Sequence, residues 1–323
     1  MRVGEVGTPR LGGRQRQRLH RLSARRPRGM LCWILVLLLL AVIPPVFFHF
    51  RLRRLPKKRS QKCAWMDDPP LVCAHGGDAS KSAPNTMGAY HEALRANVDC
   101  IEIDVSRSSD GVLFALHDRD LQRMTGNDTI KVGYLRKDEV ERLDASLRLP
   151  HKRENQEVLT VEDALLLVSK SVKRVVLDAK VGPPLYEKGL AKDILSIVQK
   201  TNCGNCIIWA KNDILVRDIL KQSQDVQIGY IVMRDPSTGA RSKLLRMKGA
   251  DVVGVYHPLI EEKMMRTLHG GGKKVYAWTV DDEPSMQRML YESVDAVITS
   301  RPTLLQEVLR KMKAECREGF LFW

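Results

Sequence analysis

The chain has 323 residues, enough for one large domain with an extension, and a formal net charge of +15 at pH 7. Residues 1–62 carry 16 Arg or Lys and a single acid, Glu5, which leaves 37 basic and 37 acidic residues in 63–323. Binding to a phosphate backbone needs a concentrated basic face, so the electrically neutral body excludes nucleic acid as its partner.

The first element expected along the chain is a membrane anchor. Residues 31–50 contain no Asp, Glu, Lys or Arg, and about twenty residues at helical rise cross a bilayer. We therefore predict a single-pass membrane protein. Its amino-terminal parts are a basic tail at 1–29, a transmembrane helix at 30–50 and a basic linker at 51–66.

Two other interpretations of this front compete with the anchor. A cleaved signal is one, because Pro44 and Pro45 leave an apolar run as short as a signal core, although no small-residue cleavage site follows. An organelle transit peptide is the other, because the front is rich in Arg and poor in acids. Eight basic residues in 10–29 and seven in 51–70 flank the apolar segment, so membrane orientation and organelle stay open.

Beyond the linker, short runs rich in Val and Ile alternate with longer amphipathic stretches, which is typical of βα units around a parallel sheet. Asp110-Gly111 marks a linker too short for a parallel crossover, so the second and third strands form a hairpin. The remaining eight strand–helix pairs predict an α/β fold, a TIM-type (β/α)8 barrel at 67–316 with a β-hairpin insertion, followed by a tail at 317–323. Strands are predicted at 71–75, 100–105, 112–117, 174–179, 206–210, 227–233, 251–256, 274–280 and 295–299, and helices at 85–97, 160–171, 186–201, 212–222, 239–248, 259–269, 283–292 and 303–315.

The seven cysteines are an odd number scattered through a long chain, a distribution that does not predict a disulfide framework. Cys203 and Cys206 form a Cys-x-x-Cys pair. No second pair and no thioredoxin-like setting accompany them, so neither zinc nor redox chemistry is favoured.

Polar residues interrupt or end several predicted strands, where a barrel would gather an active site. Glu102 and Asp104 are two residues apart, so their side chains leave the strand on the same side. Two carboxylates in one site repel unless a hard divalent ion such as Mg²⁺ or Ca²⁺ neutralises them. Asp178, near the end of another strand, is the natural third ligand, and this pattern predicts a metal site.

Each of these residues also has an ordinary structural interpretation. A single acid near a strand end is more often a solvated edge or a helix cap than a ligand, and His75 taken alone is more often a buried structural histidine. His117 could equally end an exposed hairpin. The convergence of two histidines, three carboxylates and Lys180 at strand ends favours the functional interpretation.

The segment 73–126, which begins CAHGGD and ends QRMTG, resembles the opening signature of the glycerophosphodiester phosphodiesterase family. The resemblance continues at VVLDAKV, VYAWTVDD and VDAVITSRP and so covers about residues 70–302. The apolar segment and the spelling HGGD are similar to the plant membrane-anchored members.

This resemblance implies a barrel of the phospholipase C-like phosphodiesterase type, a bound divalent ion, and hydrolysis of glycerophosphocholine, glycerophosphoethanolamine and similar diesters to sn-glycerol 3-phosphate and an alcohol. The site residues that it implies share the positions of the family's motifs. They are the acid/base histidines His75 and His117, the metal ligands Glu102, Asp104 and Asp178, and the substrate-binding residues Lys180 and Trp278.

The sequence departs from the family pattern at three positions. Gly76 stands where Arg usually follows the first histidine, and the loss of that phosphate donor suggests that Gly76→Arg should lower KM unless the glycine is needed for its backbone shape. Pro84-Asn85-Thr86 lacks the glutamate of Pro-Glu-Asn-Thr. Asp178 replaces the usual Glu.

These features leave alternatives open. A lysophospholipase D-type activity on membrane lipids is one, and a catalytically inactive barrel that binds phospho-ligands is another. The choice between Mg²⁺ and Ca²⁺, the assignment of acid and base to the two histidines, and the oligomeric state are not determined by the sequence.

Overall fold

The computed structural model describes residues 32–33, 36–49, 63–145 and 157–321, within two units, Met1–Lys57 and Lys58–Trp323. In the first unit, residues 36–49 are helical. Among the described residues, no helix combines the length and the apolar character needed to cross a membrane. The predicted span at 30–50 lies partly outside these residues and is not confirmed.

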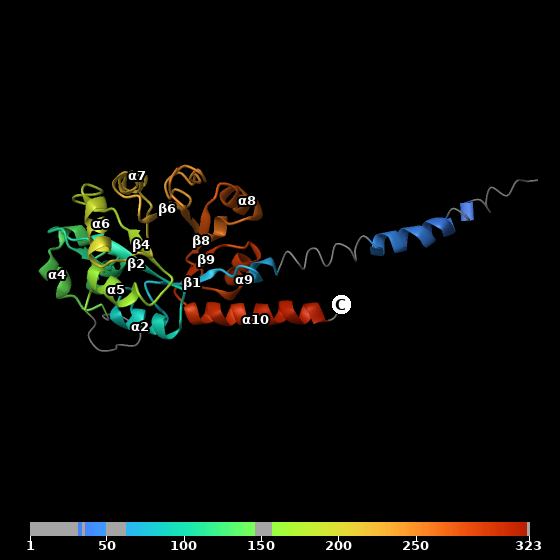
Figure 1. Ribbon diagram of the computed structural model, residues 1–323, viewed down its shortest axis with the longest axis horizontal. Helices are drawn as coiled ribbons and strands as arrows, with labels where there is room; N and C mark the ends of the chain where they lie inside the picture. Colours follow the sequence, from blue (N-terminus) through green and yellow to red (C-terminus); the bar gives the residue numbers. More distant parts are fainter. Residues whose placement is uncertain (1–31, 34–35, 50–62, 146–156, 322–323) are drawn as a thin grey trace, which may run out of the picture. The chain divides into compact units, whose positions relative to one another are not determined.

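The second unit is built on nine strands, eight of which form a closed parallel barrel (Figure 1). β1 pairs in parallel with both β2 and β9, which closes the ring, and β3 pairs antiparallel with β2, as the predicted hairpin requires. The predicted barrel is therefore confirmed. The strands are β1 Leu71–His75, β2 Cys100–Arg107, β3 Leu113–Phe114, β4 Arg174–Ala179, β5 Cys206–Ala210, β6 Gln227–Val232, β7 Val252–Tyr256, β8 Lys274–Trp278 and β9 Ala296–Thr299.

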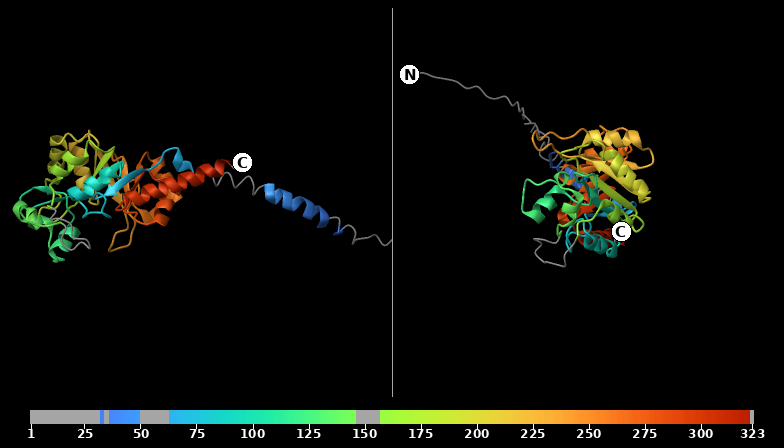
Figure 2. Two further views of the ribbon diagram at one scale, coloured as in Figure 1. Left: turned by 90° about the horizontal axis from the view of Figure 1, so that it is seen from below. Right: turned by 90° about the vertical axis from the view of Figure 1, so that its left-hand side faces the viewer.

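Helices cover the outside of the strands, as the two further views in Figure 2 show. Two short helices, α3 and α4, were not predicted, because the hairpin region gives no apolar period of sufficient length. The helices are α2 Met87–Arg95, α3 Asp118–Thr125, α4 Lys137–Glu141, α5 Val161–Val168, α6 Leu190–Lys200, α7 Asp213–Gln222, α8 Glu262–Gly270, α9 Glu283–Tyr291 and α10 Pro302–Leu321.

The predicted helix at 239–248 is wrong. Gly239 adopts φ +66°, and the Asp235 carboxylate accepts backbone hydrogen bonds from the two residues that follow Pro236, which makes a tight turn. Further along, the Tyr230 hydroxyl donates to the carbonyl of Leu244, and Arg246 donates to both oxygens of Asp213. These tertiary contacts hold the segment in turns and override its local helical preference.

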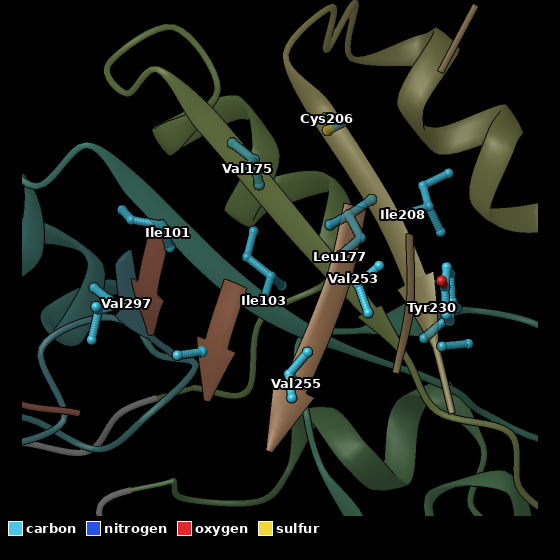
Figure 3. Packing of buried hydrophobic residues seen from close by; sticks show 14 of the residues in the cluster. Ile101, Ile103, Val175, Leu177, Cys206, Ile208, Tyr230, Val253, Val255 and Val297 are labelled. Carbon is cyan, nitrogen blue, oxygen red and sulfur yellow. The ribbon is translucent and has the colours of Figure 1, made fainter. Parts of the chain in front are cut away.

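Alternate residues of each strand point to opposite sides, which creates two apolar layers. Outward-facing residues such as Ile101 and Ile103 on β2 pack with Val175 and Leu177 on β4 beneath the helices (Figure 3). Inward-facing residues fill the barrel; they are Cys73, Cys100, Val176, Ile207, Trp209, Ile231, Val252, Tyr276, Ala296 and Ile298.

Three disulfides correct the expectation of no disulfide framework: Cys63–Cys316, Cys73–Cys100 and Cys203–Cys206. Cys73 and Cys100 are direct partners across β1 and β2. Two of the three bonds join residues that are distant in sequence, so only the folded topology brings the sulfur atoms together, and the spacing along the chain does not predict the pairs.

The 3-10 helix Ala64–Met66 lies at the amino-terminal end of the barrel. Trp65 and Met66 line an apolar hollow with Val72 on β1, Asp99 just before β2, and residues of α10. The adjacent Cys63 is bonded to Cys316 near the end of α10. Cys63, the first described residue of this unit, therefore lies at the end of the barrel where the strands begin.

Candidate active site

Strand alternation places the predicted polar residues at the other end of the barrel. In β2, Glu102 and Asp104 share the inward face with Cys100. Asp104 is the direct partner of Asp178 on β4, and His75 on β1 is the partner of Glu102. The last inward positions of neighbouring strands thus bring these side chains together.

Three carboxylates form the centre of the site. Glu102, Asp104 and Asp178 are buried, and one oxygen of each lies within 4.8 Å of the others. Two oxygens on opposite sides of one Ca²⁺ lie about 4.6–5.2 Å apart, so one ion can reach all three groups. Asp178 Oδ1 is also buried without a hydrogen-bond partner in the described part of the chain. The oxygen-only donor set and this orphaned atom fit a hard divalent ion.

Lys180 supplies positive charge beside the carboxylates. Its Nζ lies 2.6 Å from Asp104 Oδ1 and also pairs with Asp178. Burial raises the pKa of Glu102 well above its usual range, and the neighbouring Asp104 adds to that effect. Burial acts in the same direction on Asp104, but the charge and the hydrogen bond of Lys180 oppose it, and the pKa of that carboxyl lies well below its usual range. Asp104 therefore stays ionised more readily than Glu102.

Asn85 orients Asp104. Its Nδ2 donates to Asp104 Oδ2 at 2.8 Å, and its Oδ1 accepts from the backbone N–H of Asp104 at 3.2 Å and from the Tyr90 hydroxyl at 3.1 Å. Thr86 next to it caps α2 by accepting from the backbone N–H of Ala89. The shortened Pro-Asn-Thr motif thus positions a carboxylate and starts a helix.

Two histidines flank the carboxylates. His75 Nε2 lies 3.9 Å from Glu102 Oε2, and burial lowers the pKa of His75 below its ordinary value. His117 caps α3, because its Nδ1 accepts a hydrogen bond from the backbone N–H of Arg119 at 3.1 Å. A ring nitrogen that accepts cannot carry the proton, so neutral His117 carries it on Nε2. Burial, followed by the charge of Lys180, lowers the pKa of His117 to about 3 and keeps the ring neutral.

A pocket with a volume of about 40 Å³ lies over this centre, and both histidines and Trp278 line it. Trp209, Ile231 and Ile298 form its apolar floor. Tyr256 is the direct strand partner of Trp278, and their ring centroids lie 5.6 Å apart. Every residue predicted for the site therefore lies in or directly beneath one pocket; the lining residues are His75, Glu102, His117, Arg119, Asp178, Lys180, Trp209, Lys211, Ile231, Trp278, Thr279 and Ile298.

Two cations of this pocket, Arg119 and Lys211, were not predicted. Lys211 directly follows β5 with the same alternation as Ile207 and Trp209, so strand parity alone could have placed it. Arg119 lies in the first turn of α3, a helix that the sequence analysis did not identify.

Gly76 adopts φ +62°, a left-handed conformation that side chains rarely tolerate. A Cβ at this position would lie 3.0 Å from Pro84 Cβ and 3.2 Å from the backbone nitrogen of Asn85. The local backbone therefore favours glycine.

A parallel (β/α)8 barrel that gathers an acidic cation site, two neutral histidines and basic side chains at the carboxyl ends of its strands is built for metal-assisted phosphodiester chemistry. Residues 75–304 match the glycerophosphoryl diester phosphodiesterase family, and the chain belongs to that family. It is 55% identical over 288 residues to the glycerophosphodiester phosphodiesterase GDPD4 of Arabidopsis thaliana, covering 89% of this chain and 88% of the relative.

Solved structures of the family share the fold. A glycerophosphoryl diester phosphodiesterase of Silicibacter pomeroyi, described as putative, aligns with a TM-score of 0.65 at 20% identity, covering 76% of this chain and 95% of its own. A phosphodiesterase of Oleispira antarctica, solved with the product sn-glycerol-3-phosphate, aligns with a TM-score of 0.65 at 22% identity, covering 75% and 97%. The barrel is thus the common architecture of these proteins.

Proposed function

We propose that this chain hydrolyses small glycerophosphodiesters, such as glycerophosphocholine and glycerophosphoethanolamine, to sn-glycerol 3-phosphate and an alcohol. The observation that carries the proposal is the convergence of three carboxylates and two neutral histidines on one barrel-end pocket in a member of this family. The Arabidopsis relative bears the name of this activity, and the Oleispira structure holds its product.

Glu102, Asp104 and Asp178 would hold a divalent ion, Mg²⁺ or Ca²⁺. When bound, such an ion neutralises the carboxylates and polarises the phosphoryl group. Lys180 adds positive charge at the same centre, and Trp278 forms the wall against which the glycerol or head group packs.

The two histidines have different roles in this proposal. His75 is neutral and takes the proton from the attacking hydroxyl, which is either water or the neighbouring hydroxyl of the glycerol. His117 cannot take a proton on Nε2, because that nitrogen already carries one while Nδ1 accepts from the backbone. His117 therefore donates a hydrogen bond from Nε2 to the departing oxygen, which becomes the alcohol by taking a proton from solvent water, while the proton on His75 returns to solvent.

The test is turnover of glycerophosphocholine by the full chain in detergent, with Mg²⁺ or Ca²⁺ added and sn-glycerol 3-phosphate measured as product. Glu102→Gln should abolish activity, and the matched surface variant Glu141→Gln should not. Faster turnover of lysophosphatidylcholine would favour the lysophospholipase D activity. A folded, metal-loaded protein with no turnover of any glycerophosphodiester would leave the inactive binding barrel as the function.

We further propose that residues 30–50 anchor the chain as a single-pass membrane protein with the barrel in an oxidising compartment. The basic blocks on both sides of the apolar segment support the anchor. Three disulfides support the compartment, because disulfides persist where thiols are not kept reduced.

Asn127 offers a direct test of this placement. Asn127-Asp128-Thr129 is the only Asn-x-Ser/Thr sequence in the chain, and Asn127 is exposed in the turn after α3. A glycan that an endoglycosidase removes from the wild type, and that Asn127→Gln lacks, would support a lumenal barrel. Extraction of the intact protein by carbonate without detergent would refute the anchor.

A further inference from the structure

Arg119 and Lys211 are two cations of the active-site pocket to which the family resemblance assigned no role. They come from different elements, Arg119 from the first turn of α3 and Lys211 from the residue after β5. They share the pocket with His75 and His117, so a ligand that reaches the histidines also meets these two side chains.

Neither cation is neutralised by the protein. In the described residues, the Arg119 guanidinium makes no ion pair, and the Lys211 Nζ has only the Trp278 ring, 5.4 Å from its centroid. Lys180 differs, because it pairs with both Asp104 and Asp178. Burial lowers the pKa of Lys211, and the charges of Lys180 and Arg119 lower it further, while Asp178 and Asp104 oppose this shift without cancelling it. The arrangement has the electrostatics of a site for an anion.

Gly76 explains why a cation for the phosphoryl group is needed at a position other than the one after His75, where the family usually has Arg. The arginine expected after the first histidine is absent, and the left-handed backbone, with Pro84 Cβ 3.0 Å and the backbone nitrogen of Asn85 3.2 Å from where a Cβ would lie, strains any side chain there. Positive charge for the phosphoryl group must therefore come from other elements that face the same pocket.

We propose that Arg119 and Lys211 form an anion subsite that binds the nonbridging oxygens of the substrate's phosphodiester. The proposal rests on the proposed function, because the anion is the group to be cleaved. Arg119 offers a planar fork of donors to two oxygens, and Lys211 offers a point charge held against Trp278.

The experiment compares the full-length wild type with Arg119→Gln, Lys211→Gln and the double variant. Arg217→Gln is the matched control, because it removes an exposed charge from α7, outside the pocket. Two quantities are measured: KM and kcat for glycerophosphocholine, and the Kd of inorganic phosphate by calorimetry. A hydrogen bond to a charged group contributes about 1.5–3 kcal/mol, so each single variant should raise KM and the phosphate Kd by roughly 10- to 100-fold. Arg119→Lys should restore part of the loss.

The outcomes separate this inference from the proposed function. A wild type that turns over substrate, with a double variant that keeps wild-type KM and phosphate affinity, would overturn the subsite. A loss confined to a substrate with an anionic head group, such as glycerophosphoserine, would also overturn it, because the cations would then recognise the head group. If the wild type showed no turnover but bound phosphate, and if both single variants bound phosphate more weakly, the subsite would be supported and the activity refuted.

Discussion

Removal of the Cys63–Cys316 disulfide should be the most damaging change to stability outside the barrel core. The bond closes a sequence separation of 253 residues, whereas Cys203–Cys206 closes a separation of 3. In the chain-entropy account, a crosslink lowers the entropy of the unfolded chain by about 2.1 + 1.5R ln n cal/mol/K, where n is the loop length. At 25 °C this gives about 5.5 kcal/mol for the long loop and about 1.6 kcal/mol for the short one.

The assay is urea and thermal unfolding of Cys63→Ser/Cys316→Ser, monitored by tryptophan fluorescence. Cys203→Ser/Cys206→Ser is the matched control. The larger loss corresponds to a fall in Tm on the order of 10–20 °C. Activity of the folded variant at 25 °C should match the wild type, because this disulfide lies at the end of the barrel opposite the pocket. Equal losses in the two double variants, or a larger loss in the control, would refute the loop-length argument.

The remaining predictions concern the site. Asp104→Asn should weaken metal binding, so its activity should recover partly in a metal titration, whereas His75→Ala should stay about 10²–10⁴-fold slower at saturating metal; parallel recovery would contradict the assigned roles. Gly76→Arg and Gly76→Ala should both lower Tm, because a left-handed residue with a side chain costs about 1–2 kcal/mol of folding free energy, and neither should lower KM. A lower KM for the arginine variant alone would show that the missing charge can be restored at this position. The pKa of His117 is about 3 when folded and roughly 6.5 when unfolded, so the unfolded chain binds more protons between these values and stability falls as pH falls through that window. His117→Asn keeps the helix cap without the titrating ring, so its Tm should fall less than that of the wild type between pH 7 and 5; equal slopes would exclude His117 as the source.

The strands could be predicted from the sequence because a closed parallel barrel buries both faces of each strand. Runs such as VVLDA and CIIWA are continuous in apolar character, and a polar residue inside such a run marks a site. The candidate metal ligands were predicted in this way. The helix predicted at 239–248 was wrong because long-range contacts decide the conformation of that segment. Tyr230 bonds to Leu244 and Arg246 bonds to Asp213, and neither Tyr230 nor Asp213 lies in the segment.

Of the two cations that were not predicted, Lys211 could have been placed from the sequence and Arg119 could not. Lys211 continues the inward alternation of its strand and could have been placed by parity. Arg119 depends on α3, whose start is set by an unusual histidine cap. The tautomer of His117 likewise follows only from that three-dimensional hydrogen bond.

The position of Cys63 at the amino-terminal end of the barrel has a consequence for substrate supply. The short helix with Trp65 and Met66 lies where the strands begin, and the pocket lies where they end. A barrel tethered through Cys63 to any surface can therefore turn its pocket toward the aqueous phase. In that orientation, a water-soluble diester would reach the pocket by three-dimensional diffusion from solution. A lipid moving laterally in that surface would have to leave it before reaching the histidines.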